Sequence, residues 1–486
     1  MGIKSLYRDS LALLTDLYEL TMACGYWKAG VLDKEAVFIL YFRENPFNGG
    51  FTVACGLQYV IEYLRDFHFA EDDLAYLATV TGSDGKPLFP PEFLDYLRGL
   101  RLACDIDAIP EGTVVFPHEP LVRVRGPILQ AQILETALLN MINFQTLIAT
   151  RAARTCRAAR GEPVIEFGLR RAQGIDGGVT VARAAYVGGC TSTSNVLAGK
   201  LFGIPVKGTH AHSWVMSFNT EMESFIAWAE AMPNNSIFLV DTYNSLEGTR
   251  HAVEAGKLLR ARGYTLAGIR LDSGDLAYLS IEARKILDES GFPDAAIIGS
   301  SELDEHIIDS LKEQGAAINV WGVGTKLTTA YDQPALGGIY KLTAIREPGG
   351  PWQPKLKLSE QIVKINTPGI LQVRRYYDEN GFVADMIYDE VTGVTDPWLV
   401  IDPADPTRRK HIPEGTPYEL LLAPIFRKGE LVYQSPSLEE SRARALDQLG
   451  KLHPTIKRLL NPHEYTAGLE AGLYELKTRL ILEARE

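Results

Sequence analysis

The stretch Leu266-Ala-Gly-Ile-Arg-Leu-Asp-Ser-Gly-Asp275 decides the fold, because it joins an apolar strand to a polar turn that opens a helix. Residues 266–271 are predicted as a strand, and residues 276–290 have the apolar spacing of a helix. Side chains alternate between the two faces of a strand, so Arg270 and Asp272 are expected on the same side. The stretch therefore predicts one strand-to-helix step of an α/β domain, with charged side chains at its turn.

The same step recurs on both sides of this stretch at near-regular spacing. Strands are expected at 164–168, 205–209, 237–240, 266–271, 295–299 and 318–322, and helices at 193–202, 222–231, 245–262, 276–290 and 305–314. Six such steps predict a parallel sheet. Polar residues of functional character follow every strand, at 166–170, 209–212, 241–243, 270–275, 300–302 and 324–325. A β/α-barrel is therefore expected, because an open doubly wound sheet would gather them at one switch point.

The chain on either side of these steps has a different pattern. The barrel domain is expected over residues 133–340 and begins with a long helix at 133–160. Residues 1–132 predict an N-terminal α+β domain that opens with an amphipathic helix at 11–27. Residues 341–436 are β-rich and are expected to return to the N-terminal domain, and residues 437–486 predict C-terminal helices. The fold class is thus α/β, with a β/α-barrel and an α+β domain built from N- and C-terminal segments.

Composition limits the class of protein. With 486 residues, 46% of them hydrophobic, the chain can build a large core in more than one domain. Its net charge of -12 argues against nucleic acid or an anionic membrane as the main partner, although a pocket can still attract a small anion. No apolar run reaches the ~18 residues of a membrane span, and no secretory pattern opens the sequence. Five scattered cysteines without a C-x-x-C pair fit reduced thiols, so a cytoplasmic protein is expected.

Two polar runs in the first half of the barrel region could hold an anion. Glu166-Phe-Gly-Leu-Arg-Arg171 ends a strand with two guanidiniums, which match phosphate oxygens, but surface ion pairing is an equally good explanation. Gly188-Gly-Cys-Thr-Ser-Thr-Ser-Asn195 opens a helix with free backbone N–H groups. Ordinary helix capping by a Ser or Thr side chain is the commoner explanation of that second run.

Two histidines stand close together in Gly208-Thr-His-Ala-His-Ser213. A zinc site would need further ligands, and neither an H-E-x-x-H motif nor a cysteine pair supplies them. A catalytic or phosphoryl-accepting histidine and a buried structural histidine remain equally good interpretations. Alternation along a strand would point both rings to one side, so geometry does not choose between His210 and His212.

Two further motifs suit a phosphorylated ligand. Arg270 and Asp272 on one face suit an anionic group beside ribose hydroxyls or Mg²⁺, with an internal salt bridge as the alternative. Gly322-Val-Gly-Thr325 is a backbone nest that can hold a phosphate. Ile237-Phe-Leu-Val-Asp-Thr242 has a single acid and no accompanying Thr-Gly-Gly-Thr loop, which argues against a Rossmann-like phosphoribosyltransferase. Walker, dinucleotide-binding and nucleophile-elbow motifs are also lacking in the sequence.

Taken in order, the motifs resemble those of the nicotinate phosphoribosyltransferase family over nearly the whole chain. No single motif is decisive, but their order and spacing together are highly specific. They are Leu14-Thr-Asp-Leu-Tyr-Glu-Leu-Thr-Met22, Tyr41-Phe-Arg-Glu-Asn-Pro-Phe47, Glu166-Phe-Gly-Leu-Arg-Arg-Ala-Gln-Gly174, Gly208-Thr-His-Ala-His-Ser213, Gly268-Ile-Arg-Leu-Asp-Ser-Gly-Asp275, Gly322-Val-Gly-Thr325 and Gly337-Gly-Ile-Tyr-Lys341. The resemblance implies a barrel like that of the type II phosphoribosyltransferases.

The resemblance also implies roles for individual residues. Tyr18 would cover the pyridine ring from a neighbouring subunit, and Phe167 would stack on the other face of that ring. Arg270 would face the nicotinate carboxylate and Asp272 the ribose, while His212 would be the histidine that ATP phosphorylates. The other expected substrate-binding residues are Arg170 and Arg171 for phosphates, Thr209 for nicotinate, Gly324 and Thr325 for the 5-phosphate, and Ser213, Asp241 and Ser300.

The implied reaction joins nicotinate to 5-phosphoribosyl 1-pyrophosphate with coupled ATP hydrolysis, the first step of NAD synthesis from nicotinate. The pyridine nitrogen has no proton to lose, so the reaction needs positioning and charge stabilisation and no general base. Mg²⁺ on the leaving pyrophosphate and ATP as a co-substrate are implied, without a dedicated protein metal cluster. The expected partner is a second copy of the chain in a homodimer with shared active sites, and neither nucleic acid nor a membrane.

Two rival functions follow from the same residues. The nearer rival is a relative on the same barrel that uses nicotinamide or quinolinate instead of nicotinate. The other is a non-catalytic phosphoribosyl or nucleotide sensor. A sensor could lose some of Arg170, His212, Arg270 and Asp272, and the chain has all four. A structural protein is disfavoured too, because it would need no polar cluster after every strand.

Overall fold

The computed structural model describes residues 10–361 and 364–486, and the chain forms two compact units. The inserted unit comprises Ile148–Pro334, and the flanking unit comprises Met1–Leu147 together with Ala335–Glu486. The chain passes from the flanking unit into the inserted unit between Leu147 and Ile148, within the long helix α6 (Glu135–Ala158). The inserted unit carries the strand-to-helix steps that the sequence predicts.

The inserted unit contains a sheet of six parallel strands in the order β7-β6-β11-β10-β9-β8. Apolar residues of the strands β8, β9 and β10, such as Phe238, Ile269 and Ile297, are fully buried. Such burial is typical of a parallel sheet whose two faces are both covered. The strands are β6 (Val164–Glu166), β7 (Ser192–Thr193), β8 (Ile237–Leu239), β9 (Gly268–Leu271), β10 (Ala296–Gly299) and β11 (Val320–Val323).

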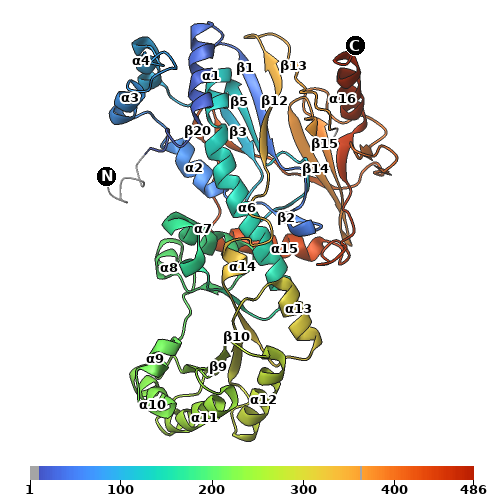
Figure 1. Ribbon diagram of the computed structural model, residues 1–486. Coiled ribbons are helices and arrows are strands. Elements are labelled where there is room, and N and C mark those ends of the chain that lie inside the picture. Colours follow the sequence, from blue (N-terminus) through green and yellow to red (C-terminus); the bar gives the residue numbers. More distant parts are fainter. Residues whose placement is uncertain (1–9, 362–363) are drawn as a thin grey trace. The chain divides into compact units, whose positions relative to one another are not determined.

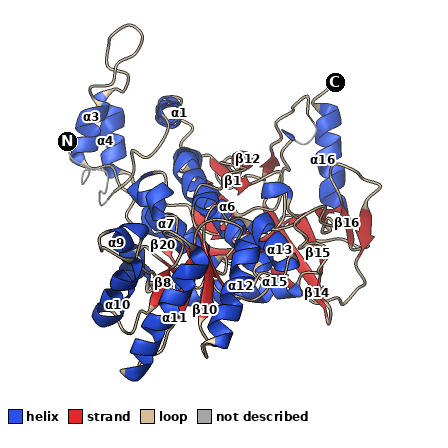
Figure 2. Cartoon of the chain, turned by 60° about the horizontal axis from the view of Figure 1, so that its bottom comes forward, coloured by secondary structure: helices blue, strands red, loops and turns tan. Residues whose placement is uncertain are grey.

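Helices follow the strands and cover the sheet, with α11 and α12 packed against strands β9 and β10 (Figures 1 and 2). Capping side chains explain why three of these helices start where they do. The side chains of Asn244, Asp275 and Asp304 each accept a hydrogen bond from the first turn of their helix. The helices are α7 (Gly174–Val187), α8 (Val196–Phe202), α9 (His212–Met216), α10 (Glu221–Ala231), α11 (Ser245–Ala261), α12 (Leu276–Glu289), α13 (Glu305–Glu313) and α14 (Thr325–Thr328), with a 3-10 turn η3 at Leu169–Arg171.

One predicted strand is wrong, and a different segment takes its place in the sheet. Residues 205–209 form only an isolated bridge between Val206 and Thr193, and strand β7 pairs with β6 instead. The helix expected at 193–202 in fact begins at Val196, and Thr193 belongs with Ser192 to strand β7. Lys207 and Gly208 are exposed, so this segment runs as a loop towards His210. Helix α7 was also missed.

The flanking unit is built from both ends of the chain. In its seven-stranded sheet, of order β13-β12-β1-β5-β3-β19-β20, strand β1 pairs with β12 and β3 pairs with β19. A six-stranded sheet of order β17-β16-β21-β15-β14-β18 and the small sheet β2-β4 complete it. The strands of the seven-stranded sheet are β1 (Glu35–Tyr41), β3 (Asp105–Ala108), β5 (Val122–Pro127), β12 (Ile339–Arg346), β13 (Gln353–Pro354), β19 (Ala423–Arg427) and β20 (Glu430–Leu431).

The other elements of the flanking unit are the strands of its two smaller sheets and its helices. The six-stranded sheet consists of β14 (Leu371–Asp378), β15 (Gly381–Asp389), β16 (Leu399–Ile401), β17 (Arg409–His411), β18 (Tyr418–Leu420) and β21 (Ala467–Glu470), and the small sheet of β2 (Thr52–Val53) and β4 (Val114–Val115). The helices are α1 (Leu17–Lys28), α2 (Leu57–Arg65), α3 (Glu71–Leu77), α4 (Pro91–Gly99), α5 (Ile128–Ile133), α15 (Leu438–Lys451) and α16 (Ala471–Glu483), with a 3-10 turn η2 at Pro46–Asn48. Within the described residues, no helix has the length and apolar character needed to span a membrane.

Candidate active site

A cavity of about 530 Å³ lies among the loops that follow the parallel strands of the inserted unit. The carboxyl ends of parallel strands are where ligand sites of α/β proteins are found. The cavity brings together ten of the residues selected from the sequence. Its lining consists of Phe167, Leu169, Arg170, Arg171, Ser194, Gly208, Thr209, His210, Ala211, His212, Arg270, Asp272, Ser300, Ser301, Glu302, Gly322, Gly324 and Thr325.

Three selected residues lie outside this lining. Ser213 is the second residue of α9 and is exposed. Asp241 follows β8 with its side chain only 1% exposed, and it holds groups that line the cavity. Tyr18 belongs to α1 of the flanking unit, where it is 47% exposed and its hydroxyl donates to Glu135 at 3.3 Å.

The backbone of strand β11 determines where Phe167 lies. The Phe167 N–H donates to the carbonyl oxygen of Val323 at 2.8 Å, which extends the pairing of β6 and β11 by one residue. The aromatic ring packs over Gly322, and a Cβ on that glycine would come within 2.6 Å of two ring carbons. A glycine at 322 therefore makes room for the ring at the cavity wall.

The arginines of the cavity are not neutralised by neighbouring acids. Arg170 and Arg171 lie on the 3-10 turn η3 and are exposed, and Arg270 projects from β9. The Arg270 Nη2 donates to the His210 carbonyl oxygen at 3.3 Å, and its buried Nε has no hydrogen-bond partner. Burial lowers the pKa of Arg270, while Asp272 and Asp241 oppose that shift. Within residues 10–361 and 364–486, none of the three forms an ion pair, so the salt-bridge interpretation of Arg270 is wrong.

Two carboxylates follow neighbouring strands at the cavity. The Asp241 Oδ2 accepts hydrogen bonds from the Asp272 N–H at 2.9 Å and from the Ser273 hydroxyl at 2.6 Å. Its Oδ1 is buried without a hydrogen-bond partner. The Asp272 Oδ1 accepts from the Ser300 hydroxyl at 2.5 Å. The network fixes Asp272 beside Arg270 and keeps one oxygen of Asp241 available.

The two histidines of the 208–213 segment lie in different surroundings. His210 is 5% exposed, and its ring contacts Phe225, Trp228 and Phe238, with a centroid separation of 5.0 Å to Trp228. Its Nε2 accepts a hydrogen bond from the Leu239 N–H at 3.3 Å. Burial lowers the pKa of His210 to about 4, so the ring is neutral near pH 7. His210 therefore anchors the segment to β8.

His212 opens helix α9 and is accessible from the cavity. Its side chain is 40% exposed, its Nδ1 lies 3.1 Å from the Thr242 hydroxyl, and its Nε2 lies 3.8 Å from Asp241 Oδ1. Of the two alternatives that the sequence left open, the buried structural histidine describes His210, and the role of His212 as phosphoryl acceptor stays a prediction. Strand alternation could not predict the contact between Thr242 and His212.

The last loop of the cavity carries a possible phosphate cradle. Gly324 caps α14, and the Thr325 hydroxyl donates to Glu302 at 3.2 Å. Thr328, one turn further on, is fully buried and donates to Glu166 at 3.3 Å. Ser301 adopts a φ of 132°, which is a strained backbone conformation for a residue with a side chain. The sequence contains no pattern that predicts this conformation.

Metal binding in this cavity would rely on few protein ligands. Among the described residues, no group of three His, Cys, Asp or Glu side chains is arranged to hold a metal ion. Asp241 with its unpartnered oxygen and Asp272 are hard oxygen ligands at adjacent strand ends. Mg²⁺ keeps several waters and is often held by one or two carboxylates together with substrate phosphates, so these two residues fit it.

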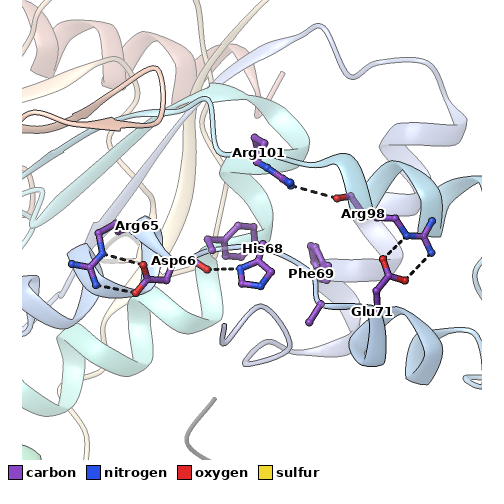
Figure 3. Close-up of a pocket in the computed structure, with 9 residues that line it drawn as sticks. Arg65, Asp66, His68, Phe69, Glu71, Arg98 and Arg101 are labelled. Carbon is purple, nitrogen blue, oxygen red and sulfur yellow. Dashed lines mark hydrogen bonds and ion pairs between the residues drawn. The ribbon is translucent and has the colours of Figure 1, made fainter. Parts of the chain in front are cut away.

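A second hollow, of about 940 Å³, lies in the flanking unit between α2 and the helices α3 and α4 (Figure 3). Its arginines already have partners. Arg65 pairs with Asp66 at 2.9 Å, Arg98 pairs with Glu71 at 2.8 Å, and Arg101 donates to the Arg98 carbonyl oxygen at 3.4 Å (Figure 3). Two of its three arginines are thus paired with acids, and among the described residues only Arg101, which donates to backbone carbonyl oxygens, lacks an ion pair here.

The cavity at the strand ends of the parallel sheet, with three arginines that form no ion pair with a described residue, has the charge that suits an anionic small molecule. Models for the N-terminal domain, the family and the C-terminal domain of nicotinate phosphoribosyltransferase (NAPRTase) match residues 13–143, 163–348 and 371–477. The chain belongs to the nicotinate phosphoribosyltransferase family, whose members are pentosyltransferases.

Individual relatives agree with this family over almost the whole chain. Nicotinate phosphoribosyltransferase of Bacillus subtilis is 44% identical over 484 residues, which cover 98% of this chain and 96% of that protein. The Homo sapiens enzyme is 35% identical over 96% of each chain. The crystal structure of human nicotinic acid phosphoribosyltransferase has a TM-score of 0.82 at 33% identity and covers 96% of this chain and 99% of its own. Nicotinate-nucleotide pyrophosphorylase from Pyrococcus furiosus, at 22% identity and a TM-score of 0.71, shares the fold.

Proposed function

We propose that this chain transfers the phosphoribosyl group of 5-phosphoribosyl 1-pyrophosphate to nicotinate and couples the transfer to ATP hydrolysis. The products are nicotinate mononucleotide and pyrophosphate, as in the first step of NAD synthesis from nicotinate. The observation that carries the proposal is a cavity lined by three arginines without an ion pair, Arg170, Arg171 and Arg270, and by Asp272, whose N–H donates to Asp241 outside the lining. Every expected substrate is an anion, and family membership supplies the reaction class.

The parallel sheet of the inserted unit is proposed to close as a β/α-barrel of the type II phosphoribosyltransferase kind. Two observations support closure. The pairing runs without interruption from β7 to β8, and the Thr193–Val206 bridge adds a further parallel contact beyond β7. The loop after Val206 leads to His210, which accepts a hydrogen bond from the backbone of β8. This loop thus links the two end strands of the sheet.

The positions of the cavity residues suggest how nicotinate binds. Phe167 would stack on the pyridine ring from the wall at Gly322. Arg270 would pair with the nicotinate carboxylate, which would satisfy the guanidinium nitrogen that now lacks a partner. Thr209, across the cavity, would contact the same substrate.

The remaining cavity groups would hold the phosphoribosyl pyrophosphate. Arg170 and Arg171 would bind phosphates, and Gly324 with Thr325 would take the 5-phosphate on backbone N–H groups and a hydroxyl. Asp272, fixed by Ser300, would face the ribose, and Asp241 and Ser213 would support the adjoining groups. Mg²⁺ held by Asp241 and Asp272 would neutralise charge on the leaving pyrophosphate.

The chemistry requires positioning more than proton transfer. The pyridine nitrogen attacks the anomeric carbon while the bond to pyrophosphate breaks, so positive charge develops on the ribose and negative charge on the leaving group. Asp272 would stabilise the first charge, and Arg170 and Arg171 would stabilise the second. No side chain of the cavity has to remove a proton from nicotinate.

ATP coupling is proposed to proceed through His212. Thr242 engages the Nδ1, so the Nε2 is the nitrogen that would take the terminal phosphoryl group as ADP leaves. For this attack the Nε2 would carry the lone pair, and the proton of the neutral ring would sit on Nδ1, which would donate it to the Thr242 hydroxyl. Water would later hydrolyse the phosphohistidine to phosphate, which supplies the free energy that favours synthesis.

A homodimer with shared active sites completes the proposal. Tyr18 is 47% exposed on α1, as a residue that reaches a neighbouring subunit must be. Mixing an inactive Tyr18→Ala chain with an inactive Asp272→Ala chain should restore part of the activity in hybrid dimers. A fully active, monodisperse monomer in light scattering would contradict the shared site. The five cysteines are free, in agreement with the proposed cytoplasmic location.

One assay tests the proposed reaction. Purified protein is incubated with phosphoribosyl pyrophosphate and Mg²⁺, and with nicotinate, nicotinamide or quinolinate in parallel, each with and without ATP. We expect nicotinate mononucleotide as the dominant product, with a yield that ATP increases. Faster turnover of nicotinamide or quinolinate would favour the rival relatives, and tight binding without any product would favour a sensor.

A further inference from the structure

Glu166 is a buried carboxylate at the end of β6 that the proposed reaction does not use. Its side chain is fully buried, with 0% exposure. Its Oε1 accepts hydrogen bonds from the Gly168 N–H and, at 3.3 Å, from the Thr328 hydroxyl. Its Oε2 accepts from the Thr193 hydroxyl at 2.6 Å. The donors come from three different segments of the chain.

Each of those three segments leads into a cavity loop. Gly168 lies between Phe167 and the arginines of η3, Thr193 precedes the cavity residue Ser194, and Thr328 ends the short helix that Gly324 and Thr325 begin. The strands involved are neighbours in the order β7-β6-β11. One carboxylate thus connects the ring wall, the arginine turn and the phosphate cradle.

The contact between two of these loops is too close for any side chain at position 168. A Cβ on Gly168 would lie 1.5 Å from Thr328 Oγ1 and 3.0 Å from Glu166 Oε1. Burial raises the pKa of Glu166, and the hydrogen bonds from its three neutral donors oppose that shift. A buried carboxylate held by hydrogen bonds alone is costly to misplace, so its donors fix the positions of their loops.

We infer that Glu166 is a positioning residue that sets the relative places of the β6, β7 and α14 loops around the substrates. It does not touch the reacting atoms. It acts through Phe167, through the η3 arginines and through Gly324 and Thr325. This inference rests on the proposed function, because it assigns the α14 loop to the 5-phosphate and the β6 loop to nicotinate.

The test compares variants that remove the contacts one at a time. Thr328→Val removes the hydroxyl from the α14 loop and keeps the side-chain volume, so the KM for phosphoribosyl pyrophosphate should rise roughly tenfold while the KM for nicotinate stays close to that of the parent. Glu166→Ala removes all three contacts and should lower kcat about a hundredfold, as expected for misplaced reacting groups. Glu166→Gln retains an acceptor for the Gly168 N–H and should fall between them.

Glu162→Gln is the matched control, because Glu162 lies just before β6 and accepts hydrogen bonds from Trp321 at 2.7 Å and Lys312 at 2.6 Å, outside the cavity lining. This variant should lower the melting temperature but should leave the KM for phosphoribosyl pyrophosphate and the KM for nicotinate close to those of the parent. If Glu166→Ala does not fold, Thr328→Val and Glu166→Gln still decide the question.

The outcomes separate this inference from the proposed function. An inactive parent protein would contradict the proposed function. An active parent whose Thr328→Val and Glu166→Gln variants lose only thermal stability, like Glu162→Gln, would overturn the positioning role. Calorimetric titration with phosphoribosyl pyrophosphate, without nicotinate, gives a second readout: weaker binding to Thr328→Val supports the role, and unchanged binding opposes it.

Discussion

The two arginine-lined hollows of the molecule differ in how their charges are compensated. In the flanking unit, Arg65 and Arg98 pair with acids on their own or neighbouring helices (Figure 3). In the inserted unit, Arg170 and Arg171 have no ion pair with any described residue, and Arg270 has a buried nitrogen without a partner. The hollow in the flanking unit is the larger, at about 940 Å³ against about 530 Å³. Volume alone favours the hollow of the flanking unit, whereas the number of arginines without an ion pair among the described residues, three against one, favours the cavity that we propose as the active site.

The physical reason for the difference lies in what each charge does. An exposed ion pair contributes little to stability and can form wherever opposite charges meet on a surface. A guanidinium that is partly buried without an acid is unfavourable unless an anion binds there. Arg270 in the cavity of the inserted unit is in this unfavourable state, and a bound anion would stabilise its charge.

The largest expected effect concerns the two histidines inside the cavity. His212→Asn should abolish acid-labile phosphate from labelled ATP and nicotinate-stimulated ATP hydrolysis, and leave weak synthesis without ATP. His210→Asn should still become phosphorylated, although burial of a poorly matched amide should lower its melting temperature. Filter binding of labelled protein measures both variants. Labelled phosphate on His212→Asn would show that the acceptor is another residue.

An intermediate effect is expected for the exposed arginines of η3. Arg170→Ala and Arg171→Ala should each raise the KM for phosphoribosyl pyrophosphate, by roughly tenfold for the residue that contacts a phosphate directly. The effect should shrink at high salt, because exposed charges are screened. Steady-state kinetics at two ionic strengths distinguishes the two positions. If neither variant changes this KM, the phosphates bind elsewhere.

The smallest effect is expected in the other hollow. Arg98→Ala removes the pairs with Glu71 and Asp95, both on exposed surface, so the melting temperature should change by a few degrees at most. The KM values and kcat should equal those of the parent. A loss of phosphoribosyl pyrophosphate binding in Arg98→Ala would contradict the contrast between the two hollows.

The sequence predicted the cavity best where strand alternation applied. Arg270 on β9 and Asp272, the first residue after that strand, line the same cavity as expected. Strands with apolar runs, such as β8 and β10, were found close to their predicted positions because a buried parallel strand has a clear apolar signal. Alternation failed at 208–213, where no strand forms, and so His210 and His212 have different surroundings.

The remaining features have no local signal. Strand β7 consists of two polar residues, Ser192 and Thr193, which are too few to show any periodicity. The contact of Thr328 with Glu166 joins residues 162 positions apart in the sequence. Asp241 Oδ1 has no hydrogen-bond partner because both donors that reach this carboxylate bind its Oδ2. Such contacts depend on tertiary packing, so residue spacing alone could not predict them.

The most direct test of the account is the substrate preference of Arg270→Ala. Nicotinate differs from nicotinamide by one negative charge, and a charge-assisted hydrogen bond to a carboxylate is worth about 1.5–3 kcal/mol, or roughly ten- to a hundredfold in affinity. The measurement is kcat/KM for both pyridines, and the KM for phosphoribosyl pyrophosphate, in the parent, Arg270→Ala and the control Arg98→Ala. We predict that Arg270→Ala loses most of the preference for nicotinate while Arg98→Ala keeps it. An unchanged nicotinate-to-nicotinamide ratio in Arg270→Ala, with only the phosphoribosyl pyrophosphate KM altered, would contradict the assignment and place pyrophosphate at Arg270 instead.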